Sequence, residues 1–323
     1  MEHLFCHRKR LAMKPVLALD STDAGLEAGL EAAGYTLIRA YHIPEAELGP
    51  YLATAEGILL RSRIRITEAL LAQAPALQWI GRLGSGVENI DQEAAQRHRV
   101  ALYSAPEGNR SAVGEHALGM LLSLTHKIGW AHREVIGGAW NRASNTGWEL
   151  EGSTIGIIGF GHMGSAFAQR LQGFGVRILA YDKYKTGFAP ANVKEATLQE
   201  VLAESDVLSL HVPLTAETEG MVDERFVAQC ARAPFLVNTS RGGVIRTAAI
   251  WEAIQHGQLR GAALDVLDLE KRSLEGLEGL PPWWNAFLGD PRVLVTPHIA
   301  GWSEQSFPKM GETLLRKILH RLV

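Results

Sequence analysis

Short apolar runs alternate with segments of helical periodicity along most of the chain. In the first third, the runs that predict buried strands are Val16–Asp20, Thr36–Ala40, Gly57–Ser62, Leu77–Leu83 and Ala101–Ser104. Between them, Ala24–Gly34 has helical spacing and a glycine stop, and Thr67–Ala74 also has helical spacing. Strands joined by helical crossovers run parallel, so this block predicts a parallel sheet that helices cover on both faces.

The same alternation returns in a second block, which begins with the apolar, β-branched first half of Thr154–Phe167. Further strands are predicted at Val176–Asp182, Val207–Leu214, Phe235–Thr239, Ala262–Leu267 and Val293–Thr296, with helices at Thr197–Glu204, Glu224–Cys230 and Thr247–Gly257. Six strands in one block match a dinucleotide-binding domain. The last helix, Gln305–Val323, is predicted to return to the first block.

These blocks predict an α/β fold class with two doubly wound parallel-sheet domains. Residues 111–298 are expected to form a Rossmann domain that binds a dinucleotide. Residues 14–110 together with 299–323 are expected to form a discontinuous, flavodoxin-like domain for the substrate. A length of 323 residues agrees with two domains. Residues 1–13 are expected to be a disordered extension.

The segment Ser111–Trp140 has a different pattern, because its apolar residues occupy more than one helical face. A surface helix keeps one polar side, so a helix of this kind is expected to be buried between domains or between subunits. We favour a subunit interface, and hence a homodimer, over an interdomain core.

Composition and charge exclude several other classes of function. The formal net charge of −3 gives no basic footprint for nucleic acid or for an anionic membrane. No apolar run approaches the roughly 18 residues that a membrane span needs. Cys6 and Cys230 form neither a metal-ligand spacing nor a disulfide framework, which predicts a reduced, cytoplasmic setting. We expect no metal site.

Three glycines follow the strand at the start of the second block. Gly159, Gly161 and Gly164 have the spacing G-x-G-x-x-G, and Ala166–Leu171 after them predicts a helix. The first glycine permits a tight turn, the second lets the backbone approach a pyrophosphate, and the third lets the helix pack close to the sheet. The helix N-terminus then faces the anion.

An acidic residue follows the next strand at the offset that nucleotide binding requires. Asp182 lies 182 − 164 = 18 residues beyond the last glycine, close to the usual spacing of about 20. A carboxylate there accepts hydrogen bonds from ribose hydroxyls and repels a 2′-phosphate, which favours NAD over NADP. Lys183 and Lys185 follow at once and weaken that preference.

Three polar residues lie at or just beyond the ends of later strands. Arg241, Glu270 and His298 each fall where open parallel sheets bind ligands. Any one of them could be structural: a surface ion pair, a solvated loop residue or a histidine at a helix entry. Beside a nucleotide site, the three together favour catalysis.

With these residues, the chain resembles the D-isomer-specific 2-hydroxyacid dehydrogenases, in particular their phosphoglycerate-dehydrogenase-like branch. The motifs that carry the resemblance are Gly81–Asp91, Ala105–Asn109, Glu115–His116, the glycine loop, His211–Thr215, Asn238–Gly243 and Pro297–His298. The offset 270 − 241 = 29 also agrees with that family. Lys271 is a departure, because many members have proline after the glutamate, and the segment through Pro281–Trp284 is distinctive.

The resemblance implies a role for each candidate residue. Arg241 would bind the substrate carboxylate, His298 would exchange a proton with the substrate oxygen, and Glu270 would pair with His298 and favour its charged form. Asp265 would hold the nicotinamide carboxamide. The implied cofactor contacts, for NAD, are Gly159, Gly161, His162, Met163, Gly164, Asp182, His211, Pro213, Thr215, Thr239, Asp265 and His298.

The substrate contacts other than Arg241 come from the first domain. Arg61 and Ser62 match an Arg-Ser pair that contacts substrate in the resembling phosphoglycerate dehydrogenases, and Ser85, Gly86 and Asn109 would add further contacts. Together they favour a phosphorylated or otherwise dianionic 2-hydroxy acid such as D-3-phosphoglycerate. For Arg63 and Arg65, a solvated surface is the favoured interpretation.

Two other functions stay open at this stage. One is a glyoxylate or hydroxypyruvate reductase of the same family. The other is an NAD(H)-sensing binding protein of the corepressor type, since the same fold serves both enzymes and sensors.

Overall fold

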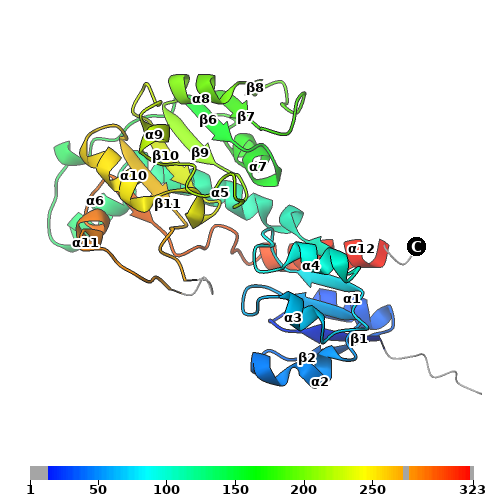
Figure 1. Ribbon diagram of the computed structural model, residues 1–323. Helices are drawn as coiled ribbons and strands as arrows, with labels where there is room; N and C mark the ends of the chain where they lie inside the picture. The colour runs from blue at the N-terminus through cyan, green and yellow to red at the C-terminus, as the bar shows by residue number, and fades with distance from the viewer. Residues whose placement is uncertain (1–13, 272–275, 321–323) are drawn as a thin grey trace, which may run out of the picture. The chain divides into compact units, whose positions relative to one another are not determined.

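The computed structural model describes residues 14–271 and 276–320, so the predicted extension 1–13 lies outside the described residues. The described chain divides into two compact units, one of residues up to Asn109 together with those from Glu304 onward, the other Arg110–Ser303 (Figure 1). Each unit contains one parallel sheet, as the sequence predicted.

The first unit contains a five-stranded sheet in the order β2-β1-β3-β4-β5, which is the flavodoxin-like order. Its strands are β1 (Lys14–Ala18), β2 (Tyr35–Arg39), β3 (Gly57–Leu60), β4 (Trp79–Arg82) and β5 (Ala101–Ser104). Its helices are α1 (Ala24–Ala32), α2 (Gly49–Leu52), α3 (Glu68–Leu71), α4 (Gln92–Arg97) and α12 (Ser306–His320). The helix predicted at Thr67–Ala74 is thus a single turn capped by Thr67, and the short α2 and α4 were not predicted.

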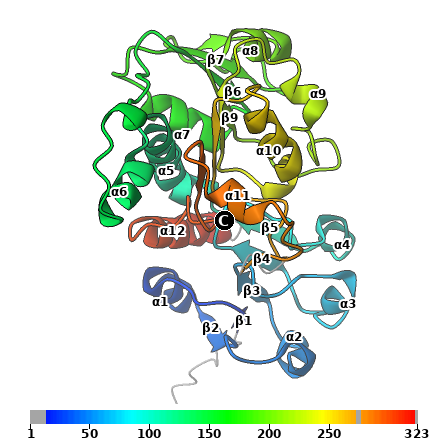
Figure 2. The same ribbon diagram turned by 90° about the vertical axis from the view of Figure 1, so that its left-hand side faces the viewer.

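The last helix completes one face of this sheet. Met310, Leu314 and Ile318 of α12 are buried in the same cluster as Leu59 and Trp79 from the sheet. Figure 2 shows α12 beside α1, which it contacts. The return of the chain to its first domain is therefore driven by apolar burial, the main favourable term in packing.

The second unit contains a seven-stranded sheet in the order β12-β11-β10-β9-β6-β7-β8. Its strands are β6 (Thr154–Ile158), β7 (Arg177–Tyr181), β8 (Lys194–Glu195), β9 (Val207–Leu210), β10 (Phe235–Asn238), β11 (Gly261–Leu264) and β12 (Val293–Val295). Read from β6, six of them have the Rossmann order and β12 extends it. The prediction of six strands missed β8, which is short and polar.

Helices cover this sheet as well. They are α6 (Ile128–Ile136), α7 (His162–Arg170), α8 (Leu198–Glu204), α9 (Glu224–Val227), α10 (Thr247–Gln255), α11 (Trp284–Leu288) and α5 (Pro106–Thr125), which begins just before the unit boundary. None of the described helices combines the length and hydrophobicity that crossing a bilayer requires.

The prediction of one helix across Ser111–Trp140 was wrong. The segment forms α5 and α6, separated at Lys127, whose backbone is left-handed with φ of 54°. Ala117, Met120, Leu121 and Leu124 of α5 are buried in the core of the unit itself, so packing within the unit explains the apolar faces of α5. In contrast, α6 exposes apolar side chains, with Ile136 at 74% exposure.

Arg63 is exposed, as predicted, but its guanidinium also forms a clamp across the first unit. Its Nε donates to Leu19 O at 2.8 Å, Nη2 to Ala40 O at 2.9 Å and Nη1 to Ile43 O at 3.0 Å. Leu19 and Ala40 directly follow β1 and β2. The planar fork of donors therefore ties together loops at the carboxyl ends of neighbouring strands.

Replacing Arg63 by lysine should lower the free energy of unfolding by about 1–2 kcal/mol, because one ammonium cannot reproduce three directed bonds. Urea unfolding followed by circular dichroism would measure the change. Arg65→Lys is the matched control at an exposed neighbour and should change stability by less than about 0.5 kcal/mol. Equal midpoints for the two variants would contradict the clamp.

Candidate functional site

The residues singled out in the second unit lie along one edge of its sheet. Gly159 follows β6, Asp182 follows β7, His211 follows β9 and Asp265 follows β11. Arg241 and His298 lie three residues beyond β10 and β12. Because all these strands are parallel, their carboxyl ends meet at the same edge, where open α/β sheets bind ligands.

The glycine loop has the geometry that a dinucleotide requires. Gly159 has φ of 92°, and a Cβ there would lie 2.6 Å from His211 O. A Cβ at Gly164 would lie 2.1 Å from Gly159 O, so this glycine lets α7 pack against the loop. Gly161 precedes α7, and a Cβ built on it meets nothing within 4 Å. The open space at Gly161, at a helix N-terminus, fits a pyrophosphate.

Asp182 holds the glycine loop in place. Its Oδ2 accepts the Phe160 backbone N–H at 2.9 Å, and its Oδ1 accepts the Tyr184 N–H at 3.1 Å. Lys185 Nζ donates to Phe160 O at 2.9 Å and lies 3.8 Å from Asp182 Oδ2. The carboxylate that was predicted to contact ribose therefore also fixes the loop beside it.

Thr239 and His211 each have a buried polar atom without a protein partner. Thr239 Oγ1 and His211 Nδ1 form no hydrogen bond within the described structure. Buried polar groups are normally paired, so these atoms fit a site that is completed by a bound molecule. Both residues were predicted to line the cofactor, and NAD fits the residues present. Pro213 and Thr215 lie in the adjoining loop, where Pro213 O and Thr215 O both accept from Thr218 Oγ1.

His211 is a half-buried histidine whose Nδ1 atom is buried. Its Nε2 lies 2.8 Å from Ser209 Oγ, and its ring packs on Phe167 with centroids 5.4 Å apart. Burial lowers the pKa of His211 to about 3, because an apolar environment disfavours the charged form. A second general acid at this position is therefore excluded near neutral pH.

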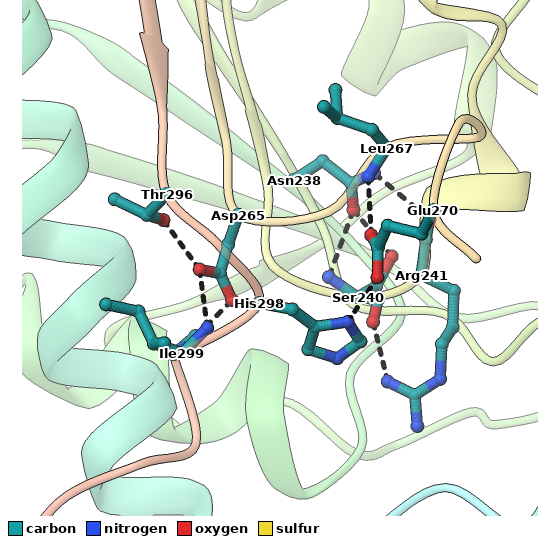
Figure 3. A network of polar contacts seen from close by, with 10 residues as sticks. Asn238, Ser240, Arg241, Asp265, Leu267, Glu270, Thr296, His298 and Ile299 are labelled. Atoms are coloured by element: carbon teal, nitrogen blue, oxygen red, sulfur yellow. Dashed lines mark hydrogen bonds and ion pairs between the residues drawn. The ribbon is translucent and has the colours of Figure 1, made fainter. Parts of the chain in front are cut away.

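Glu270 and His298 are directly paired. His298 Nδ1 lies 2.6 Å from Glu270 Oε2, and Glu270 Oε1 accepts the Leu267 N–H at 2.6 Å. Both side chains are largely buried, with 23% and 13% exposure for His298 and Glu270. The predicted pair is therefore formed, and Figure 3 shows the imidazole turned toward this carboxylate.

The residue after Glu270 explains one departure from the resembling family. The Lys271 N–H donates to Gly276 O at 2.9 Å, and the Glu278 N–H donates to Leu269 O at 2.9 Å. A proline at position 271 would lack this donor. Lysine there allows Glu270 to form an antiparallel bridge with Leu277.

Arg241 extends from the loop beyond β10. Asn238 Nδ2 donates to Arg241 O at 3.1 Å, and Asn238 Oδ1 accepts the Ser240 N–H at 3.0 Å. These bonds shape the turn that carries the arginine, whose Nη1 donates to Ser240 O at 2.6 Å. In Figure 3, the Arg241 side chain and the His298 ring extend toward the same side.

Asp265 is buried, with 2% exposure, and lies at the centre of a hydrogen-bond network. Its Oδ1 accepts from Thr296 Oγ1 at 2.6 Å and from Ile299 N at 2.9 Å, and its Oδ2 accepts from Ala300 N at 2.8 Å. Its backbone oxygen accepts the His298 N–H at 2.8 Å. The residue predicted to contact the cofactor thus holds the turn that carries His298, and its cofactor contact stays a prediction.

His116 and Thr296 belong to this network but were not assigned a role from the sequence. His116 Nε2 lies 3.1 Å from Thr296 Oγ1 and 3.5 Å from Asp265 Oδ1. Burial raises the pKa of Asp265, but hydrogen bonds from His116, Thr296 and the backbone N–H groups of Ala300 and Ile299 outweigh burial and keep it below its usual value. His116 belongs to a motif that carried the family resemblance, and Thr296 directly precedes another, which was the available signal.

Apart from Arg241, the predicted substrate residues belong to the first unit. The Arg61 guanidinium lies over the Phe307 ring, 5.2 Å from its centroid, and burial lowers the pKa of Arg61. Ser62 and Ser85 are half-buried and Gly86 is buried. Asn109 is buried, and its Oδ1 has no partner in the described structure. Contacts of these residues with a substrate stay predictions.

The lowered pKa of His211 predicts how stability depends on pH. Below pH 6.5 the unfolded chain protonates this histidine, whereas the folded chain does so only near pH 3. As the pH is lowered from 6.5 to about 3, the contribution of His211 to the free energy of unfolding therefore decreases, by up to about 1.4 kcal/mol per pH unit. His211→Asn should show a shallower loss in urea unfolding between these limits. His256→Asn, at an exposed histidine, is the control, and equal slopes in both variants would refute the prediction.

Comparison with known proteins identifies the relatives of this chain. Residues 118–300 match the model of the D-isomer specific 2-hydroxyacid dehydrogenase, NAD binding domain. D-3-phosphoglycerate dehydrogenase of Bacillus subtilis (strain 168) is 36% identical over 270 residues, which are 83% of this chain and 50% of that protein. The Homo sapiens protein of the same name is 32% identical over 304 residues, 94% of this chain and 55% of that protein. The chain therefore spans about half the length of these relatives.

Among solved structures, D-lactate dehydrogenase from Aquifex aeolicus, complexed with NAD and lactic acid, superposes with a TM-score of 0.79 at 27% identity. The match covers 96% of this chain and 95% of that one. The NAD-binding-domain match alone covers 300 − 118 + 1 = 183 of 323 residues. The chain belongs to the D-isomer specific 2-hydroxyacid dehydrogenase family.

Proposed function

We propose that the chain is an NAD-dependent dehydrogenase that transfers hydride between nicotinamide and a D-2-hydroxy acid or its 2-oxo form. The observation that carries this proposal is the 2.6 Å contact of His298 Nδ1 with Glu270 Oε2, at the carboxyl edge of a sheet with a glycine loop. A histidine oriented by a carboxylate is suited to proton exchange. When bound, NAD supplies the hydride acceptor.

In this proposal, His298 uses Nδ1 to bind Glu270 and presents Nε2 to the substrate oxygen. During oxidation Nε2 takes the hydroxyl proton, and during reduction it returns that proton. The Glu270 carboxylate orients the ring through its contact with Nδ1. Arg241 binds the substrate carboxylate, because its guanidinium offers paired donors that match two carboxylate oxygens.

We further propose a phosphorylated or otherwise dianionic substrate, with D-3-phosphoglycerate as the first candidate. The names of the relatives from Bacillus subtilis and Homo sapiens support this choice. Arg61 would supply positive charge, and Ser62, Ser85, Gly86 and Asn109 would supply polar contacts. A glyoxylate or hydroxypyruvate reductase is the alternative within the same chemistry.

A homodimer through residues 111–140 is part of the proposal. The exposed apolar side chains of Ile128, Val135 and Ile136 on α6, and of Trp140 just beyond it, support an interface there. Because α5 is buried within its own unit, α6 is the better candidate for this contact. We also propose a cytoplasmic location and neither a nucleic-acid nor a membrane partner.

Loss of the proton-exchanging group gives the sharpest prediction for the site. His298→Ala should lower kcat by about 10²–10⁴, the usual contribution of a general acid or base. NADH binding, measured by nicotinamide fluorescence, should persist. His256→Ala, at an exposed histidine, is the control and should have normal turnover. Near-normal turnover of the His298 variant would exclude its assigned role.

A panel of 2-oxo acids with NADH tests the function as a whole. We expect 3-phosphohydroxypyruvate to oxidise NADH faster than hydroxypyruvate, which has the same skeleton without the phosphate, and faster than glyoxylate. Absorbance of the nicotinamide would follow the reaction. Preference for the unphosphorylated acids would favour the reductase. Tight NADH binding without turnover of any acid would contradict the enzyme and favour an NAD(H)-sensing protein.

A further inference from the structure

Two loops of the second unit meet beside the predicted nucleotide site. One follows β7 and contains Asp182–Lys185, and the other follows β9 and contains Glu217. Strands β7 and β9 lie on either side of β6 in the sheet. Because the glycine loop follows β6, the two neighbouring loops border it at the same edge. Adenosine ribose binds in this region of a Rossmann fold.

Glu217 connects these loops with both of its carboxylate oxygens. Its Oε1 forms an ion pair with Lys183 Nζ, and its Oε2 accepts a hydrogen bond from the Tyr184 hydroxyl. The Lys183 ammonium also lies 5.8 Å from the centroid of the Tyr184 ring. Tyr184 is 80% exposed, so packing does not fix its ring. The contact with Glu217 is therefore what orients the Lys183–Tyr184 pair.

The turn that carries Glu217 is itself ordered. Thr218 Oγ1 donates to Pro213 O at 2.6 Å, and the Thr215 N–H donates to Thr218 Oγ1 at 2.9 Å. The Glu219 N–H closes the turn on Thr215 O at 2.9 Å. The backbone on both sides of Glu217 is thus held by local hydrogen bonds.

The neighbouring lysine is also engaged. Lys185 Nζ donates to Phe160 O at 2.9 Å. Lys183 and Lys185 are the two cations whose position after Asp182 weakens the sequence argument for NAD. Both are bound within the protein, and a lysine that is already paired offers less attraction to a 2′-phosphate.

We propose that Glu217 is a second determinant of selectivity for NAD over NADP, acting by holding Lys183 away from a 2′-phosphate. The proposal rests on the proposed function and deepens its cofactor site. Asp182 opposes the phosphate by its own charge, whereas Glu217 removes a counter-charge that would otherwise attract it. Asp182 on the loop after β7 and Glu217 on the loop after β9 thus both disfavour NADP.

The test replaces Glu217 by glutamine, which keeps the size and a hydrogen-bond acceptor for Tyr184 but loses the charge that binds Lys183. NADH and NADPH are titrated against the purified protein by isothermal calorimetry at low ionic strength. We expect NADPH to bind about fivefold more tightly, the equivalent of roughly 1 kcal/mol for an exposed ion pair. NADH affinity should change by less than about twofold, and the NADPH gain should shrink in high salt.

Glu219→Gln is the matched control, because it removes the same charge from an exposed position two residues away on the same turn. It should leave the NADPH affinity unchanged. Lys183→Met should also have little effect alone, and Glu217→Gln should add nothing in its background. Circular dichroism would confirm that each variant is folded.

Three results would overturn the proposal. The first is an equal gain in NADPH affinity in Glu219→Gln. The second is a gain in NADPH affinity from Glu217→Gln that persists in the Lys183→Met background. The third is no gain in NADPH affinity in Glu217→Gln while NADH still binds. If NADH binds neither the unmodified protein nor any variant, the proposed function itself is wrong, and this inference is wrong with it. NADH affinity of the unmodified protein therefore separates the two failures.

Discussion

The buried carboxylate of Asp265 is the constraint on which the rest of the site depends. His298 has a left-handed backbone with φ of 56°, a conformation that costs a residue other than glycine about 1–2 kcal/mol. Two backbone N–H groups, of Ile299 and Ala300, donate to Asp265 at 2.9 and 2.8 Å. Hydrogen bonds to a charged group each contribute about 1.5–3 kcal/mol, which is enough to offset the backbone cost. Asp265 therefore sets where the imidazole lies.

The remaining parts of the site follow from strand direction. In a parallel sheet, residues far apart in sequence reach one edge without any local contact between them, so His298 and Glu270 meet across an offset of 298 − 270 = 28 residues. Each group then depends on a short local structure for its final orientation. Asn238 shapes the turn that carries Arg241, and the bridge between Glu270 and Leu277 fixes the glutamate.

The sequence predicted the structure wherever one residue type or one hydrophobic periodicity determined it. Buried strands appear as apolar runs in the sequence. The position of Gly159 in the glycine motif indicated a tight turn, and its φ is positive. The short strand β8 was missed because Lys194–Glu195 has no apolar signature. The break at Lys127 was missed because a lysine, not a glycine, has the left-handed backbone, and the nearby Gly129 lies inside α6. The role of Asp265 in its turn was not predictable, since its partners are backbone N–H groups 34 and 35 residues away.

The position of α12 in the chain has a consequence for biosynthesis. The sheet of the first unit is complete at β5, but the residues that cover its face, such as Leu314, come after the whole second unit. During synthesis the face around Trp79 and Leu59 must wait for roughly 200 residues of further chain, about 10–40 s at typical rates. We therefore expect a chaperone to bind this uncovered apolar face of the nascent first unit.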